Sequence, residues 1–141
     1  MILSGRSVNN KVFNRIANKT ELHLKKISNP EILIMGITFK ENCPDIRNSG
    51  ALKVLKKLNN LGFAPTIFDP YFTEDPKLKG MKYSFANNFQ KVKKNLDAIL
   101  ILVPHQEFLS ISPRQLIQKT KKSGLIFDAI NLYNFKEFNK L

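Results

Sequence analysis

Continuous apolar runs recur along the chain at the spacing expected of buried strands. A strand of a parallel sheet that is covered on both faces lacks the apolar–polar alternation of a half-exposed strand, so a continuous run predicts this kind of strand. The runs predict strands over residues 32–37, 64–68, 98–103 and 125–127.

Helical patterns separate these runs. They predict helical segments over residues 51–61, 87–96, 107–109 and 114–120. Ser49 can cap the first of these helices, and Gly62 can end it in a left-handed conformation. Pro113 opens the last one, because a proline in the first helical turn gives up no hydrogen bond.

The alternation of strands and helices predicts the fold class, α/β with a Rossmann-like, doubly wound parallel sheet. A further helix is predicted ahead of the sheet, over residues 8–27, and Asn29–Pro30 ends it. Its apolar positions, Val12 and Ile16 among them, indicate either a contact surface for something outside the chain or burial within this domain.

Composition limits the domain count, the kinds of partner and the cellular compartment that we expect. The length of 141 residues suits one ordinary domain. The net charge of +12 favours acidic partners, but lysines spread over helix faces give the same total without a nucleic-acid site. One cysteine excludes an intramolecular disulfide and suits a reducing compartment. With no signal peptide or membrane span in the sequence, we expect a cytoplasmic protein.

The candidate chemistry is concentrated in the loop Gly36–Ser49, which joins the first strand to its helix. Lys40 places a positive charge near a helix N-terminus, an arrangement that suits phosphate. Arg47 can bind an anion or pair with Asp45, and we favour the pairing as the way this loop is shaped. Phe39 can cover a base or pack, and the sequence leaves both open.

A dinucleotide site is not supported by this loop. The usual fingerprint needs three glycines between strand and helix, whereas Gly36 stands alone and the next glycine is Gly50. Asp69 ends the second strand where a ribose partner would lie, but before Pro70 it is more typical of a turn.

Catalytic and metal sites are also weakly supported. Cys43 and His105 follow strands at the same predicted sheet edge, so a dyad is conceivable. Cys43 precedes Pro44 in a loop and lacks the helix N-terminus that lowers a thiol pKa, so we favour a packing cysteine and a histidine at the crevice edge. One Cys and two distant His give no metal-ligand spacing.

The loop sequence GITFKENCPDIRNS resembles the start of the C-terminal domain of the UDP-glucose/GDP-mannose dehydrogenase family, and above all its bacterial UDP-N-acetylhexosamine 6-dehydrogenases of surface polysaccharide synthesis. The resemblance continues in order through Phe68–Pro70, Val103–Phe108 and Phe127–Asp128, and Gly5–Asn9 resembles part of the family's central helix. It therefore implies residues 1–29 as the end of a dimerisation-type central helix and residues 30–141 as a UDP-sugar-binding domain.

The resemblance also implies site residues. Phe39 and Lys40 match the positions that meet the nucleotide sugar, and Arg47 is a further binding candidate. Asp45, Arg47 and Ser49 match positions that shape the loop. Many relatives carry a basic residue shortly after the last strand, and in this chain Asn131 is the one polar candidate among residues 129–132.

Members of this family oxidise the C6 alcohol of a nucleotide sugar in two NAD-dependent steps. Their NAD domain and catalytic cysteine region have no counterpart in this sequence, so we expect a UDP-sugar-binding chain that holds no cofactor and is inactive alone. A homodimer or the missing N-terminal half of the enzyme is the expected protein partner, with no nucleic acid and no membrane. The alternative is an interaction or dimerisation module without nucleotide binding.

Overall fold

The structure, a computed structural model, describes the backbone of residues 2–38, 49–72 and 78–133 and the side chains of these ranges from Lys11 onward. Its elements are α1 (Ile2–Leu24), β1 (Ile32–Met35), α2 (Gly50–Asn60), β2 (Thr66–Phe68), β3 (Ser84–Ala86), β4 (Leu96–Ile101), α3 (Pro113–Lys119) and β5 (Thr120–Asp128), with 3₁₀ turns over Phe89–Lys91 and Gln106–Ser110.

The described strands form one sheet in which every neighbouring pair is parallel, in the order β3-β2-β1-β4-β5. The predicted α/β, Rossmann-like fold is therefore confirmed. The chain builds outward from β1 in one direction as far as β3 and then returns to build outward in the other direction from β4. The point where the order reverses lies between β1 and β4, where open α/β sheets bind their ligands, beyond the carboxyl ends of the strands.

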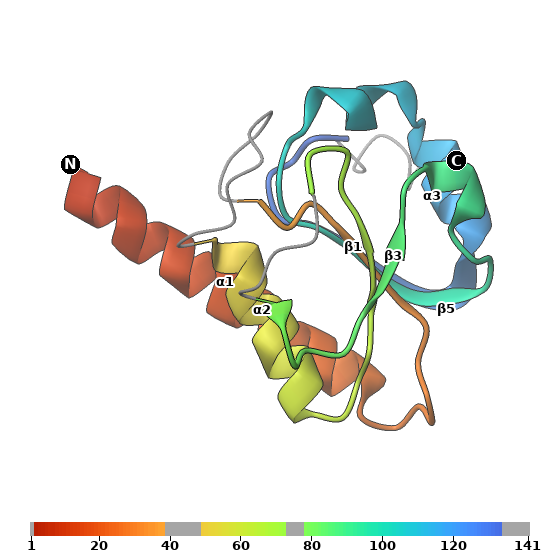
Figure 1. Ribbon diagram of the computed structural model, residues 1–141, viewed down its shortest axis with the longest axis horizontal. Coiled ribbons are helices and arrows are strands. Elements are labelled where there is room, and N and C mark those ends of the chain that lie inside the picture. Colours follow the sequence, from red (N-terminus) through yellow and green to blue (C-terminus); the bar gives the residue numbers. More distant parts are fainter. Residues whose placement is uncertain (1, 39–48, 73–77, 134–141) are drawn as a thin grey trace.

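Helices cover both faces of this sheet, with α1 and α2 on one side and α3 on the other (Figure 1). All four residues of β1 are buried, and they alternate between the two faces. Ile32 and Ile34 pack in the core under α1 and α2, whereas Leu33 and Met35 pack in the core under α3. The double coverage explains why the strand reads as a continuous apolar run.

The leading helix α1 packs on α2 and shares the core of the sheet. Ile16 and Leu24 are fully buried, and Val12 packs against the same cluster. Phe13 lies so close to Gly50 that a Cβ there would come within 2.1 Å of the Phe13 ring. Of the two explanations for the apolar stripe, burial within the domain is the one observed for these side chains. The division of the chain into a central-helix segment, residues 1–29, and a UDP-sugar-binding domain, residues 30–141, stays a prediction.

The helix predicted over residues 87–96 is wrong. Only a 3₁₀ turn, Phe89–Lys91, forms there, and the Asn88 side chain caps it by accepting a hydrogen bond from the Lys91 N–H at 3.0 Å. Asn95 then adopts a positive φ of 61°, which a helix does not allow, and β4 begins at the next residue. Local capping and turn chemistry therefore override the helical propensity of this segment.

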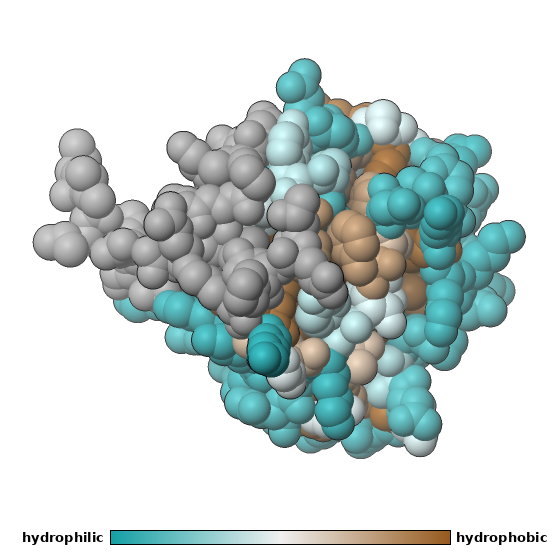
Figure 2. Space-filling model, viewed as in Figure 1, coloured by the Kyte–Doolittle hydropathy of each residue, from teal (hydrophilic) through white to brown (hydrophobic). Residues whose placement is uncertain are grey.

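The edge strand β3 was not predicted from the sequence. It is only three residues long, and two of them, Ser84 and Phe85, are exposed. Apolar residues gather in the middle of the face drawn in Figure 2, where Figure 1 places β3, and hydrophilic residues border them.

Among the described helices, none combines the length and apolar character that a membrane span needs.

The stability of the α2 face can be tested with Leu55→Ala. Leu55 is fully buried in the core, so we expect a loss of about 2–5 kcal/mol in the free energy of unfolding. Leu22→Ala is a matched control, because Leu22 is also helical but 64% exposed, and it should change stability by less than about 0.5 kcal/mol. Denaturant unfolding measures both variants, and equal losses would contradict this packing.

A pH dependence follows from Asp97, near the amino ends of the strands. Its carboxylate accepts a hydrogen bond from the Glu31 N–H at 2.8 Å and one from the Lys121 ammonium at 2.9 Å. Burial acts to raise the pKa of Asp97, but the Glu31 N–H and Lys121 outweigh it and hold that pKa below its ordinary value. Because the folded-state pKa is lowered, the stabilisation is complete above the unfolded-state pKa of about 4 and is lost as the pH falls through the folded-state value.

We therefore expect Asp97→Asn to destabilise the protein at neutral pH by about 1–3 kcal/mol. The difference from the wild type should shrink as the pH falls below about 4, because the unfolded-state carboxyl takes up a proton first and the folded-state carboxyl follows only at its lower pKa. Unfolding curves of both proteins across this range measure it, and a constant difference at every pH would contradict the assignment.

Candidate functional site

The carboxyl ends of β1 and β4 meet at the reversal of strand order. Gly36 follows β1 directly with a positive φ of 95°, and its N–H donates to the Phe68 carbonyl at 3.0 Å. A Cβ at Gly36 would lie 2.5 Å from the Cβ of Val103, beyond the end of β4. Glycine is thus required by both the backbone angle and the close approach of the two loops.

Asp69, the residue after β2, links the loops that follow three strands. It is 1% exposed, and four N–H groups donate to its carboxylate. Oδ2 accepts from the backbone of Ile37 at 2.7 Å and of Thr38 at 3.3 Å, and from the Nε2 of His105 at 2.9 Å. Oδ1 accepts from the backbone of Tyr71 at 2.8 Å, the short turn expected of an Asp before a proline. We call Ile37, Thr38, Asp69, Tyr71 and His105 the Asp69 network.

His105, two residues beyond Val103, is fully buried. Its Nε2 lies 2.9 Å from the Asp69 Oδ2 and 3.0 Å from the Thr38 Oγ1. A carboxylate only accepts, so Nε2 must carry the hydrogen, and the Thr38 hydroxyl oxygen then shares it as a second acceptor. The sequence predicts a histidine at the edge of the crevice, whereas this one is fully buried and links the β4 loop to the β1 loop.

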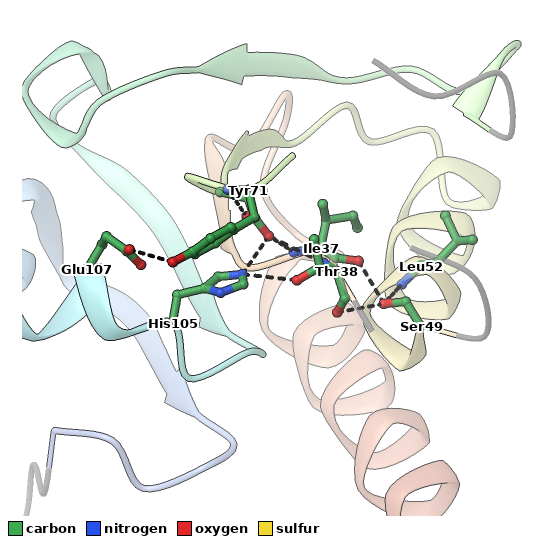
Figure 3. Close-up of polar contacts among 8 residues, drawn as sticks. Ile37, Thr38, Ser49, Leu52, Tyr71, His105 and Glu107 are labelled. Carbon is green, nitrogen blue, oxygen red and sulfur yellow. Dashed lines mark hydrogen bonds and ion pairs between the residues drawn. The ribbon is translucent and has the colours of Figure 1, made fainter. Parts of the chain in front are cut away.

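The Tyr71 ring lies beside His105, and Glu107 lies at the hydroxyl end of that ring (Figure 3). The Tyr71 ring stacks on His105 with 4.9 Å between ring centroids, and its hydroxyl donates to Glu107 Oε1 at 2.7 Å. That hydrogen bond to a carboxylate raises the pKa of the Tyr71 hydroxyl. The β2 and β4 loops are therefore joined at the surface as well as in the interior.

Ser49 holds the far end of the candidate loop. It is the N-cap of α2, 2% exposed, and its Oγ accepts from the Leu52 N–H at 3.4 Å. The same hydroxyl lies 2.7 Å from the Ile37 carbonyl oxygen, to which it donates, and 3.3 Å from the Thr38 carbonyl oxygen. Both ends of loop 38–49 are therefore fixed next to each other at the end of β1 (Figure 3).

The inner part of this loop, residues 39–48, lies outside the described residues. It contains the binding candidates Phe39, Lys40 and Arg47, the predicted Asp45 pairing and the Cys43 of the conceivable dyad. The structure describes the two residues that flank this segment in the sequence, Thr38 and Ser49.

Asn131, the remaining binding candidate, is exposed and follows β5 at the same sheet edge, with a positive φ of 54°. The Asp128 carboxylate fixes this turn by accepting from the backbone N–H groups of Leu132 at 3.0 Å and Tyr133 at 2.8 Å. The Tyr133 hydroxyl donates to the Phe108 carbonyl at 2.6 Å, and burial raises its pKa. Asn131 thus lies at the same edge of the sheet as the carboxyl end of β1, with β4 between them.

The described residues do not fit a dinucleotide in the usual Rossmann manner. The turn after β1 lacks the glycines that let a pyrophosphate approach the backbone. Asp69 occupies the position of the ribose-binding acid, but its carboxylate is directed inward and is engaged by four N–H groups.

Comparison with known proteins agrees with this geometry. Residues 33–135 match the UDP binding domain of the UDP-glucose/GDP-mannose dehydrogenase family. Protein CapL of Staphylococcus aureus is 29% identical over 99% of this chain and 33% of its own length. The UDP-N-acetyl-D-glucosamine 6-dehydrogenase of Salmonella typhi is 32% identical over 91% of this chain and 31% of its own length.

A solved structure of a related dehydrogenase shows the same similarity. The native UDP-N-acetyl-mannosamine dehydrogenase Cap5O of Staphylococcus aureus superposes with a TM-score of 0.70 and 26% identity, over 92% of this chain and 29% of that one. The chain spans about a third of the length of the curated relatives named above. Since the family match covers most of the sequence and includes the strands whose ends form the site, this chain belongs to the UDP-glucose/GDP-mannose dehydrogenase family, as its UDP binding domain.

Proposed function

We propose that this chain binds the UDP part of a nucleotide sugar at the carboxyl ends of β1 and β4. The match of residues 33–135 to a UDP binding domain carries this proposal. Phe39 and Lys40 contact the ligand, with Arg47 and Asn131 as further contacts, and Asp45 and Ser49 shape the loop.

The geometry of the described residues supports this position. Loop 38–49 begins where the strand order reverses and ends at the N-terminus of α2, where backbone N–H groups favour an anion. Ser49 uses its hydroxyl to join the two ends of the loop, so Phe39 and Lys40 follow a fixed start. A diphosphate is the part of UDP that such a loop suits.

The activities of related proteins support a wider proposal. Several are UDP-N-acetylhexosamine dehydrogenases, and others are UDP-glucose 6-dehydrogenases. The chain serves an NAD-dependent UDP-N-acetylhexosamine or UDP-glucose 6-dehydrogenase of surface polysaccharide synthesis in the cytoplasm. NAD and the catalytic cysteine belong to a part of the enzyme outside these 141 residues, so the chain alone oxidises nothing.

Assembly with that enzyme half, or with a second copy of the chain, is part of the same proposal. The competing possibility is an interaction module without nucleotide binding. It is favoured by Asn131, which stands where the family resemblance leads one to expect a basic residue. UDP binding decides between the two.

The direct test is a calorimetric titration of the chain with UDP. We expect saturable binding that Lys40→Ala weakens by about tenfold or more, because a hydrogen bond to a charged group contributes about 1.5–3 kcal/mol. Lys56→Ala is the matched control, since Lys56 is an exposed lysine on α2 beyond the first turn of that helix, and it should leave affinity unchanged.

Two results would contradict the proposal in different ways. Wild-type affinity in Lys40→Ala would remove Lys40 from the site while leaving UDP binding intact. A folded wild-type chain that does not bind UDP would support the interaction module instead.

A further inference from the structure

We propose that Asp69 is a positioning residue for nucleotide binding, and that His105 assists it. The inference rests on the proposed function and deepens it: Asp69 does not touch the ligand but sets where Phe39 and Lys40 begin. A substitution of Asp69 should therefore change UDP affinity, in addition to any effect that it has on folding.

Burial excludes direct contact with a ligand. Asp69 is 1% exposed and His105 is fully buried, and the Tyr71 ring stacks on His105 from outside. Each polar contact of the Asp69 carboxylate described above is with the protein itself. Any influence of this pair on a bound nucleotide must therefore pass through the residues that it holds.

Asp69 holds Ile37 and Thr38, the two residues that directly precede the binding candidates Phe39 and Lys40 in the sequence. The Ile37 N–H donates to Asp69 Oδ2 at 2.7 Å, and the Ile37 carbonyl accepts from Ser49 at 2.7 Å. Ile37 is thus fixed through both of its polar backbone groups. Thr38 is tied to Asp69 through its N–H at 3.3 Å and to His105 through its hydroxyl at 3.0 Å. Phe39 follows Thr38 with no residue between.

The network needs a carboxylate at this position. Four N–H groups converge on the two oxygens of Asp69. Asparagine offers one oxygen and one NH₂ group, so at least one N–H would face a donor instead of an acceptor. Asp69→Asn therefore disturbs the start of the loop while it changes the side-chain volume little.

The chain offers a matched control. Asp97 is a second buried carboxylate, 4% exposed, that also accepts a backbone N–H, but it lies at the opposite, amino end of the strands. Asp97→Asn should destabilise the fold by a comparable amount without reaching the loop. The two variants therefore separate a positioning role from a purely structural one.

The test is a UDP titration of the wild type, Asp69→Asn and Asp97→Asn, at a temperature where unfolding curves show all three folded. We expect Asp69→Asn to weaken UDP binding about tenfold or more, and Asp97→Asn to stay within about twofold of the wild type. In a Lys40→Ala background the additional effect of Asp69→Asn should be smaller than in the wild type, because one of the two contacts that it positions is gone.

If Asp69→Asn does not fold, the pair His105→Gln and His105→Leu replaces it. Glutamine keeps an N–H donor for Asp69, so it should retain more UDP affinity than leucine. Wild-type affinity in Asp69→Asn, or equal losses in the two His105 variants, would overturn the positioning role while UDP binding stands. A wild-type chain that does not bind UDP would overturn the proposed function and this inference with it.

Discussion

The carboxylate of Asp69 is the contact on which the geometry of the binding edge depends. A buried carboxylate is strongly destabilising unless several donors satisfy it. In this fold the donors come from the loops after β1, β2 and β4, so satisfying one side chain fixes three loops relative to one another. The start of loop 38–49 is therefore set by residues far away in the sequence.

Strand order explains why these loops can meet at all. Because β1 lies between β2 and β4, and all three strands are parallel, their carboxyl ends lie side by side at one edge of the sheet. Asp97 makes a comparable contact at the other edge, where it holds the residue before β1. Two buried carboxylates thus fix β1 at both ends, and only the one at the carboxyl end adjoins the predicted ligand loop.

Much of the fold could be predicted from the sequence because the strands β1 and β4 are buried on both faces and the helix α2 has a cap, an apolar stripe and a terminating glycine. These signals are local and strong. The edge strand β3 gave no such signal, because it is three residues long and mostly exposed. The helix predicted over residues 87–96 failed because Asn88 and Asn95 favour turns.

The candidate site was only partly predictable, because only part of it consists of residues that are adjacent in the sequence. The loop carrying Phe39 and Lys40 could be identified from a contiguous motif. The partnership of Asp69 with His105 could not, since 36 residues separate them and only strand order brings them within 2.9 Å. The one available signal was that both residues follow predicted parallel strands, which places them on one edge without showing that they touch.

The most direct test of this account is to record the backbone amide resonances of ¹⁵N-labelled protein during addition of UDP. The account predicts the largest shifts at Ile37 and Thr38, in the residues that follow them, and after β4 and β5, with little change around Glu31 and Lys121 at the opposite edge. Shifts concentrated at that opposite edge, or along β3, would show that the nucleotide binds elsewhere and would contradict the account.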